Sequence, residues 1–424
     1  MQNISSRETG SQPADNPALR WFALITAAAT FVLVWIGGLV TSHDAGMTVP
    51  DWPTTYGYNM FFFPISKWFG GIFYEHTHRL VASGVGLLTT ILALWLFGRK
   101  SHPLLRWGGI LFLVAGLLLL FVNPQSAIRN PQLPTVSHIG EDIMLACIGL
   151  VALASSFVWP NCEPSPKWLR TLGVIAFFAV VIQGVLGGLR VTMLKDQLGI
   201  FHATLAQLFF VLVSAIALFQ TKFWRELPSH EGSDAKGLRF LFLGTSILIL
   251  CQLMLGATMR HQHAGLAIPD FPAAYGKLWP NTDPASVLKY NQLRFGEEDP
   301  NYITAFQIIL QMVHRLMAGI IFLSVAACAW LARRQFGPSH RLSRLTVVWT
   351  FLIAAQVLLG AATIWTGKSA DIATAHVACG ALSLVAGSMI LLISFRCLTA
   401  AARIKCAEQR NELTTLLPSS SIVR

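Results

Sequence analysis

The stretch GGLVTSHDAGMTVPDWPTTYG, which runs from Gly37 to Gly57, recurs in the same chain as GATMRHQHAGLAIPDFPAAYG, from Gly256 to Gly276. Both copies contain the pattern AGxxxPDxPxxYG, and each follows an apolar run of helical length. After each copy and a further loop comes a helical segment with the sequence HRL, which begins at His78 in one half and at His314 in the other. Repetition at a long interval indicates a duplicated structural unit, so we expect two related halves.

A second repeated pair supports the duplication. IQGVLGGLRVTMLKDQLGIFHATLAQ contains His202, and AQVLLGAATIWTGKSADIATAHVACG contains His376. Each segment has the pattern Gln-x-x-x-Gly near the end of an apolar run, then a short loop, then a histidine near the start of the next run. Each half thus supplies four helices and two histidines. We predict two pseudo-symmetric four-helix bundles.

The composition places these helices in a membrane. Of the 424 residues, 54% are hydrophobic and 12% are charged, whereas about 25% of the residues in a soluble globular protein are charged. The net charge of +11 would suggest nucleic acid as the partner of a soluble protein. The bias of basic residues toward one side of the membrane explains it better, so we expect membrane lipids as partners and no nucleic acid.

Apolar runs of about 20 residues, the length needed to cross a bilayer, define the predicted spans. They lie at about 21–43, 72–97, 105–122, 139–159, 170–192, 200–220, 238–259, 304–332, 345–366 and 372–395. With the N-terminus inside, most of the 31 Lys and Arg residues fall in the inside segments. This bias predicts ten spans with both termini in the cytoplasm.

The predicted fold is therefore an all-α polytopic membrane protein with two four-helix transmembrane bundles and an inserted helix pair. Its predicted parts are a cytoplasmic tail (1–20), an N-terminal bundle (21–100 and 169–222), the inserted helix pair (101–168), a cytoplasmic linker (223–237), a C-terminal bundle (238–397) and a second cytoplasmic tail (398–424). The inserted pair has no counterpart in the second half, and we expect it to dock on the side of the first bundle.

The four repeat-related histidines lie near the outer ends of predicted spans. An ionisable residue inside a membrane is costly and is a functional hypothesis by default. Two histidines on two helices of one bundle suit a haem with two axial imidazoles, with His78 and His202 in the first bundle and His314 and His376 in the second. A lone helix histidine is more often a hydrogen-bonded interface residue, and that alternative stays open.

Charged neighbours of these histidines suggest further roles. Arg79 and Arg315 directly follow a histidine. They are candidates for contacts with haem propionates, because a guanidinium pairs well with carboxylates, or they extend toward the membrane interface. Small residues between the helices, Gly184, Gly187, Gly188 and Gly360, would let a flat macrocycle approach the backbone.

Glu75 marks the sharpest difference between the halves. It precedes His78 by three residues and shares a helical face with it, whereas Gln311 holds the matching place before His314. A carboxylate at this place could move protons or stabilise a developing cation. The alternative is an interfacial glutamate paired with Arg79. The asymmetry predicts that the first bundle does the chemistry and the second supplies electrons.

These segments together resemble the haem A synthase family, in its Cox15/CtaA-like form. The resemblance rests on AGMTVPDWPTTYG, EHTHRLVAS, QGVLGGLRVT with FHATLAQ, AGLAIPDFPAAYG, VHRLMAG and TAHVACG. It covers nearly the whole chain except residues 101–168. The resemblance implies an oxidoreductase that converts the C8 methyl group of haem O into the formyl group of haem A by successive hydroxylations, for use in terminal oxidases.

The resemblance also implies roles for individual residues. His78 and His202 would be the axial ligands of the substrate haem, Glu75 would be catalytic, and His314 and His376 would ligate a haem b cofactor. It further implies a bacterial cytoplasmic membrane location, with the haem sites near the outer face. A haem O synthase, an electron donor and a homo-oligomer are left open as partners.

Two features depart from the family pattern. The first outer loop, from His43 to Tyr74, has no cysteine, whereas some bacterial relatives carry a cysteine pair there. The inserted helix pair is the second departure. Two other functions remain open: a non-catalytic di-haem b membrane electron carrier, which would not need Glu75, and a transporter, which would not bind haem.

Overall fold

A computed structural model describes residues 15–122, 136–227, 236–294 and 302–415. The long helices are α1 (Pro17–Ser42), α2 (Gly70–Phe97), α3 (Ser101–Val122), α4 (Val136–Val158), α5 (Lys167–Met193), α6 (Asp196–Gln220), α8 (Lys236–His261), α10 (Ala305–Phe336), α11 (Arg341–Trp365) and α12 (Ala370–Thr415). Two shorter helices are α7 (Lys222–Arg225) and α9 (Pro284–Leu293). The described residues form no β-strand, so the all-α prediction is confirmed.

All ten predicted spans coincide with long helices. Within the described residues, eight helical stretches are long and apolar enough to cross a membrane, and one of them, Gly70–Val122, joins α2 to α3. Residues Asp142–Val158 of α4 add a shorter apolar helix. The predicted tails and linker fall partly outside the described residues, and the helical part of the C-terminal tail continues α12 to Thr415.

Local sequence signals explain where several helices begin. Asn16 accepts a hydrogen bond from the Leu19 amide at the start of α1, and Pro17 follows it in the first turn. Thr304 and Gln307 form a reciprocal capping box at the start of α10. Such caps bond backbone N–H groups that have no partner within the helix, so they favour the start of α1 and α10 at these residues.

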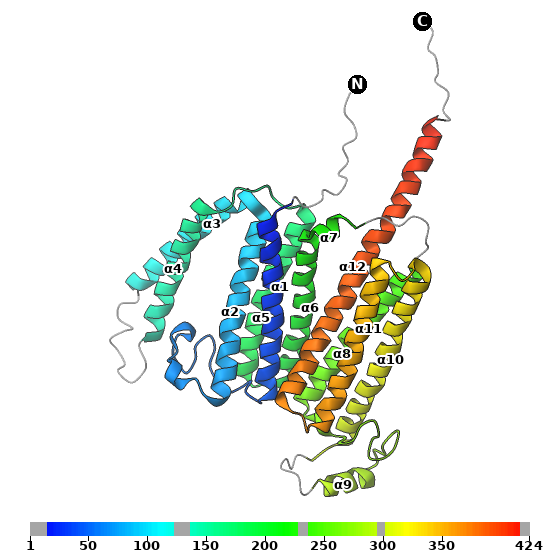
Figure 1. Cartoon of the computed structure of the whole chain (residues 1–424). Helices are drawn as coiled ribbons and strands as arrows, with labels where there is room; N and C mark the ends of the chain where they lie inside the picture. Colours follow the sequence, from blue (N-terminus) through cyan, green and yellow to red (C-terminus); the bar gives the residue numbers. More distant parts are fainter. Residues whose placement is uncertain (1–14, 123–135, 228–235, 295–301, 416–424) are drawn as a thin grey trace.

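The long helices form two bundles that pack against each other. Helices α1, α2, α5 and α6 form one bundle, and α8, α10, α11 and α12 form the other. Between the bundles, α1 contacts α12 and α6 contacts α8. This reciprocal pairing is what a two-fold relation between the halves requires. In Figure 1, α1 begins and α12 ends at the same end of the molecule, opposite to the loops that follow α1 and α8.

The two larger apolar clusters fill the end of each bundle that lies away from these loops, and a third, smaller cluster packs the loop after α8 against the start of α10. In the second bundle the core includes Phe242, Val325 and Trp349, all fully buried. In the first it includes Leu92 and Ile216. The histidines lie in the other half of each bundle, so the core provides a rigid base beneath the polar residues.

The inserted pair α3–α4 packs mainly on itself. Gly109, Gly116 and Gly149 bring the two backbones so close that a side chain at any of them would collide with the opposite helix, as is typical of small-residue packing in membranes. The expectation that the pair docks along the first bundle is wrong, because α4 makes its strong contacts with α3 and the pair leans away from the bundle in Figure 1. Its close self-packing replaces contacts with the bundle.

The pair joins the bundle at one end. The Arg99 amide donates to the carbonyl of Cys162 at 2.9 Å, and the Ser165 amide donates to the carbonyl of Leu96 at 2.9 Å. The chain therefore leaves and re-enters the first bundle at adjacent points.

Candidate functional site

The first copy of the repeated loop is folded around Asp51. Its carboxylate accepts hydrogen bonds from the amides of Tyr56 at 2.7 Å and Gly57 at 2.8 Å, and the Tyr56 hydroxyl donates to the Thr48 carbonyl at 2.6 Å. Partial burial raises the pKa of Asp51, but hydrogen bonds to the carboxylate, above all from the Gly57 amide, outweigh it and hold the pKa below its usual value. The carboxylate thus closes the turn as a charged acceptor.

The second copy has the same internal structure. Asp270 accepts from the amides of Tyr275 at 2.7 Å and Gly276 at 2.9 Å, and the Tyr275 hydroxyl donates to the carbonyl of Ala267 at 2.6 Å. Burial raises the pKa of Tyr275 to about 12, so this phenol stays a hydrogen-bond donor at neutral pH. The duplication predicted from the sequence therefore extends to individual hydrogen bonds.

Arg79 and Arg315 hold these loops against the helices. Arg79 donates to the carbonyls of Val49 at 2.9 Å, Asp51 at 2.7 Å and Thr54 at 3.0 Å. Arg315 donates in the same way to the carbonyls of Asp270 at 2.8 Å and Ala273 at 2.9 Å, with a longer contact to that of Ile268. Both guanidinium groups thus have a loop-binding role, and contact with propionates stays a prediction.

Glu75 also contacts the loop. Its carboxylate is buried and accepts one hydrogen bond from the Val49 amide at 2.8 Å and another from Arg79 at 2.8 Å. Gln311 is equally buried and accepts from the matching amide, that of Ile268, at 2.7 Å. Both residues therefore accept the matching loop amide, but Glu75 adds an ion pair with Arg79, whereas the Gln311 side chain donates to the carbonyls of Gly265 and Ile268. The catalytic role of Glu75 stays a prediction.

Each of the four histidines lies against a glycine of the preceding long helix. A Cβ atom added to Gly37 would lie 3.2 Å from Cε1 of His78, and one added to Gly187 would lie 3.3 Å from Cε1 of His202. In the second bundle, the same distance is 3.4 Å from Gly256 to His314 and 3.0 Å from Gly360 to His376. The four contacts repeat one helix–glycine–histidine arrangement, in which the absent side chain leaves room for the imidazole.

Glutamines one turn before the glycines fix the histidine-bearing helices. Gln183 donates to the carbonyl of His202 at 3.1 Å, and Gln252 donates to that of His314 at 2.9 Å. At Gln356 the contact differs, because its backbone carbonyl oxygen lies 3.1 Å from Nδ1 of His376. A backbone contact of this kind at Nδ1 orients an imidazole and leaves Nε2 for a metal ion.

The histidines pair within each bundle as the sequence predicts. His78 and His202 lie close enough for a charge on one to act on the other, and so do His314 and His376. Nδ1 of His78, His202 and His314 is buried without a hydrogen-bond partner among the described residues. An unpaired buried polar atom costs about 1–3 kcal/mol. The glycine contacts and the pairing of the imidazoles within each bundle fit a flat macrocycle whose metal takes two axial imidazoles.

The glycines named in the sequence analysis have different neighbours. Gly187 and Gly360 lie against the imidazoles of His202 and His376, whereas a Cβ at Gly188 would meet the Trp52 ring and one at Gly184 would meet nothing within 4 Å. Approach of a macrocycle to these glycines stays a prediction. Sequence reasoning missed Gly37 and Gly256. A signal for Gly256 was present, since Gln252 and Gly256 have the same Gln-x-x-x-Gly spacing as the other two helices, whereas Leu33 takes the place of the glutamine before Gly37.

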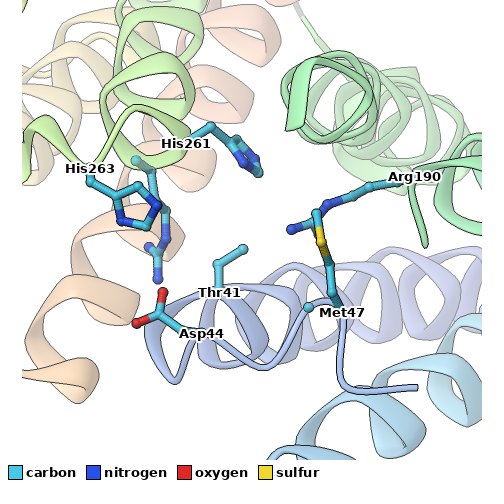
Figure 2. A pocket seen from close by; sticks show the side chains of 8 residues that line it. Thr41, Asp44, Met47, Arg190, His261 and His263 are labelled. Atoms are coloured by element: carbon cyan, nitrogen blue, oxygen red, sulfur yellow. The ribbon is translucent and has the colours of Figure 1, made fainter. Parts of the chain in front are cut away.

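Sequence reasoning also missed a cavity between the two bundles. It has a volume of about 190 Å³, and Figure 2 shows side chains from α1, α5, α8 and the loops around it. Its lining residues are Thr41, Asp44, Gly46, Met47, Arg190, Arg260, His261 and His263. No short motif brings these residues together, because they come from both halves of the chain.

Comparisons with known proteins agree with this architecture. Residues 143–388 match the family model COX15-CtaA, described as cytochrome oxidase assembly protein. The chain is 24% identical over 396 residues to a protein named "Heme A synthase" from Rhizorhabdus wittichii, with 91% of this chain and 96% of the relative covered. It is 23% identical over 399 residues to "Heme A synthase" from Geobacillus kaustophilus, with 92% and 95% covered.

The family match covers more than half of the chain, and it includes three of the four paired histidines and their glycine contacts. With its apolar helices, the chain is an integral membrane protein. It belongs to the cytochrome oxidase assembly protein family COX15-CtaA.

Proposed function

We propose that the protein is a haem A synthase, an oxidoreductase that converts the C8 methyl group of haem O into the formyl group of haem A. The names of the relatives from Rhizorhabdus wittichii and Geobacillus kaustophilus support the activity. The four matched glycine–histidine contacts are the observation that carries the assignment, because they form two separate places for a macrocycle. In this proposal the membrane is the bacterial cytoplasmic membrane, with the sites near its outer face.

The two bundles have different roles in this proposal. His78 and His202 hold haem O as substrate in the first bundle, and His314 and His376 hold haem b as cofactor in the second. Haem b, when bound, supplies one-electron redox chemistry. The protein contributes position: the glycines fix the distance of each imidazole from its neighbouring helix, and the loops close the outer end of each site.

Glu75 contributes a negative charge to the first site only. It is three residues from His78 on the same helix and is held in place by the Val49 amide and by Arg79. A buried carboxylate fixed in this way can accept a proton or stabilise positive charge that develops nearby. Gln311 cannot do either, so the proposal assigns oxidation of the methyl group to the first bundle.

The experiment is extraction of haem from the purified protein after expression in a host that also contains a haem O synthase. Separation by chromatography and mass identifies the haems. The proposal expects haem A together with haem b. Haem b alone, with unconverted haem O in the same membranes, would contradict it. The double variant His78→Ala/His202→Ala is the control, since it should form no haem A and retain haem b.

A second candidate is a di-haem b electron carrier without catalytic activity. One observation favours it: the hydrogen bond that Glu75 accepts from the Val49 amide is matched in the other bundle by the one that Gln311 accepts from the Ile268 amide. On this alternative Glu75 is a structural residue and the bundles are equivalent. The same extraction decides between the two, because only the enzyme yields a formyl haem.

A further inference from the structure

The cavity between the bundles is strongly basic. Two arginines and two histidines line it, and Asp44 is the one acidic residue among the lining residues. Arg190 and Arg260 come from different bundles, yet they lie close enough for their charges to act on each other. Two like charges held together in a cavity favour an anion between them, and the Asp44 carboxylate already acts on Arg260. Nε of Arg260 is buried and has no hydrogen-bond partner among the described residues.

The cavity adjoins both histidine pairs. Thr41 follows Gly37 by four residues, Arg190 follows Gly187 by three and Arg260 follows Gly256 by four. Residues at these spacings share a helix face. The cavity therefore lies about one helical turn, roughly 5.4 Å, nearer to the loops than the glycines that contact the histidines.

The charge of each arginine acts on histidines of one bundle. The charge of Arg190 acts on both His78 and His202. The charge of Arg260 acts on His376 in the other bundle. The arginines thus stand where the edge of each macrocycle would face the boundary between the bundles.

The two arginines also break the internal repeat. In the aligned segments, Arg260 corresponds to Thr41 in the first half, and Arg190 corresponds to Thr363 in the second. The repeated loop and helices of each half therefore form in the other half without arginine at the matching place. Arg79 and Arg315, by contrast, are repeated and donate to loop carbonyls in both halves, so they maintain the scaffold.

We propose that this cavity binds the propionate carboxylates of both haems, with Arg190 pairing with the haem of the first bundle and Arg260 with the haem of the second. This inference rests on the proposed function. It places the carboxylate edges of the two macrocycles at one shared cavity on the bundle interface. Charge-assisted hydrogen bonds to carboxylates, geometrically suited to a guanidinium, would hold each macrocycle at a fixed rotation about its iron–imidazole axis.

The test compares haem b with its dimethyl ester, which lacks the carboxylate charges. Each site is studied alone in the full-length protein, the first in a His314→Ala background and the second in a His78→Ala background. Titration followed by absorbance gives the dissociation constants. We expect each site to bind haem b at least tenfold more tightly than the ester, the factor that one charge-assisted hydrogen bond supplies. This comparison needs no arginine variant.

Variants of the two arginines then show which arginine causes the preference for haem b over its ester in each site. Arg190→Gln should remove it in the first site and retain it in the second, and Arg260→Gln should do the reverse. Arg260 also donates to the Gly38 carbonyl at 3.1 Å, so Arg260→Lys, which keeps the charge, controls for disturbed packing and should keep part of the preference. Arg79→Gln is the matched control in the scaffold, and it should weaken haem b and ester equally.

The outcomes separate this inference from the proposed function. A low-spin spectrum with two axial histidines and equal affinity for haem b and ester would overturn the cavity assignment and leave the histidine pairs intact. A preference that survives both Arg190→Gln and Arg260→Gln would also overturn it. Absence of any low-spin haem in both backgrounds would overturn the proposed function and this inference with it.

Discussion

At the scale of single residues, the duplication allows a residue of one bundle to be compared with its counterpart in the other bundle. Glu75 and Gln311 accept the same backbone hydrogen bond, from Val49 and Ile268. The carboxylate and the amide are nearly equal in shape, so the exchange of one for the other separates the structural role of the side chain from its charge. The substitution that tests catalysis is therefore Glu75→Gln, because an alanine removes both contributions together.

We expect Glu75→Gln to keep the fold and the bound haem and to abolish formation of haem A. Glu75→Ala should instead lower the free energy of unfolding by about 1–3 kcal/mol more than Glu75→Gln, because it also leaves the Val49 amide and Arg79 without their hydrogen-bond acceptor. Thermal unfolding in detergent and haem extraction measure the two effects. Full product formation by a stable Glu75→Gln variant would contradict the catalytic assignment. Gln311→Glu serves as the reciprocal control.

Asp51 gives a prediction on pH. Its pKa in the folded protein is lowered, so its stabilisation of the loop is complete above the unfolded pKa, about 4, and is lost as the pH falls through the lower folded pKa. Amide hydrogen exchange of the peptide around Tyr56 and Gly57 should show greater protection in the wild type than in Asp51→Asn above about pH 4. The difference should vanish at lower pH. A constant difference across the range would show that the charge is not responsible.

At the scale of elements, the inserted helix pair is an appendage of a complete eight-helix core. Because Leu96 and Ser165 are joined by a backbone hydrogen bond of 2.9 Å, a short Gly-Ser linker can replace residues 99–164 without moving either end. We expect this deletion to leave the haem content and the melting temperature of the bundles nearly unchanged. Loss of haem would show that the pair supports the first site.

A point variant provides the control for that deletion. Gly149→Leu should separate α3 from α4, since the backbones touch at this glycine, while the chain length stays the same. Increased protease sensitivity within α3–α4, with intact bundles, is the expected result. A comparable loss of haem in both variants would indicate that the pair acts through its folded form.

At the scale of the whole molecule, the two bundles form separate sites on a shared interface. We expect His314→Ala to lose one haem per chain and retain the haem of the first bundle, and His78→Ala to do the reverse. The haem-to-protein ratio, measured from the absorbance of the extracted haem, checks this expectation. Loss of both haems from either variant would show that the sites fill only together.

The sequence alone determined much of this protein. The apolar runs require helices in a membrane, because an unpaired backbone is too costly in lipid, and the repeated motifs predicted two bundles and the pairing of four histidines. Local patterns suffice for these features, since helix, span and repeat depend on residues near one another in the chain. The loop around Asp51 was likewise visible as a repeated motif, although its hydrogen bonds were not.

The tertiary structure decided what no local pattern contains. It assigned Arg79 and Glu75 to the support of the outer loop, because backbone carbonyls and amides about 25 residues earlier in the chain meet them there. It turned the inserted pair away from the first bundle. It brought Arg190 and Arg260, 70 residues apart in the chain, to one cavity. Only the packing of the bundles on each other puts these charges together, since that packing depends on contacts between distant segments.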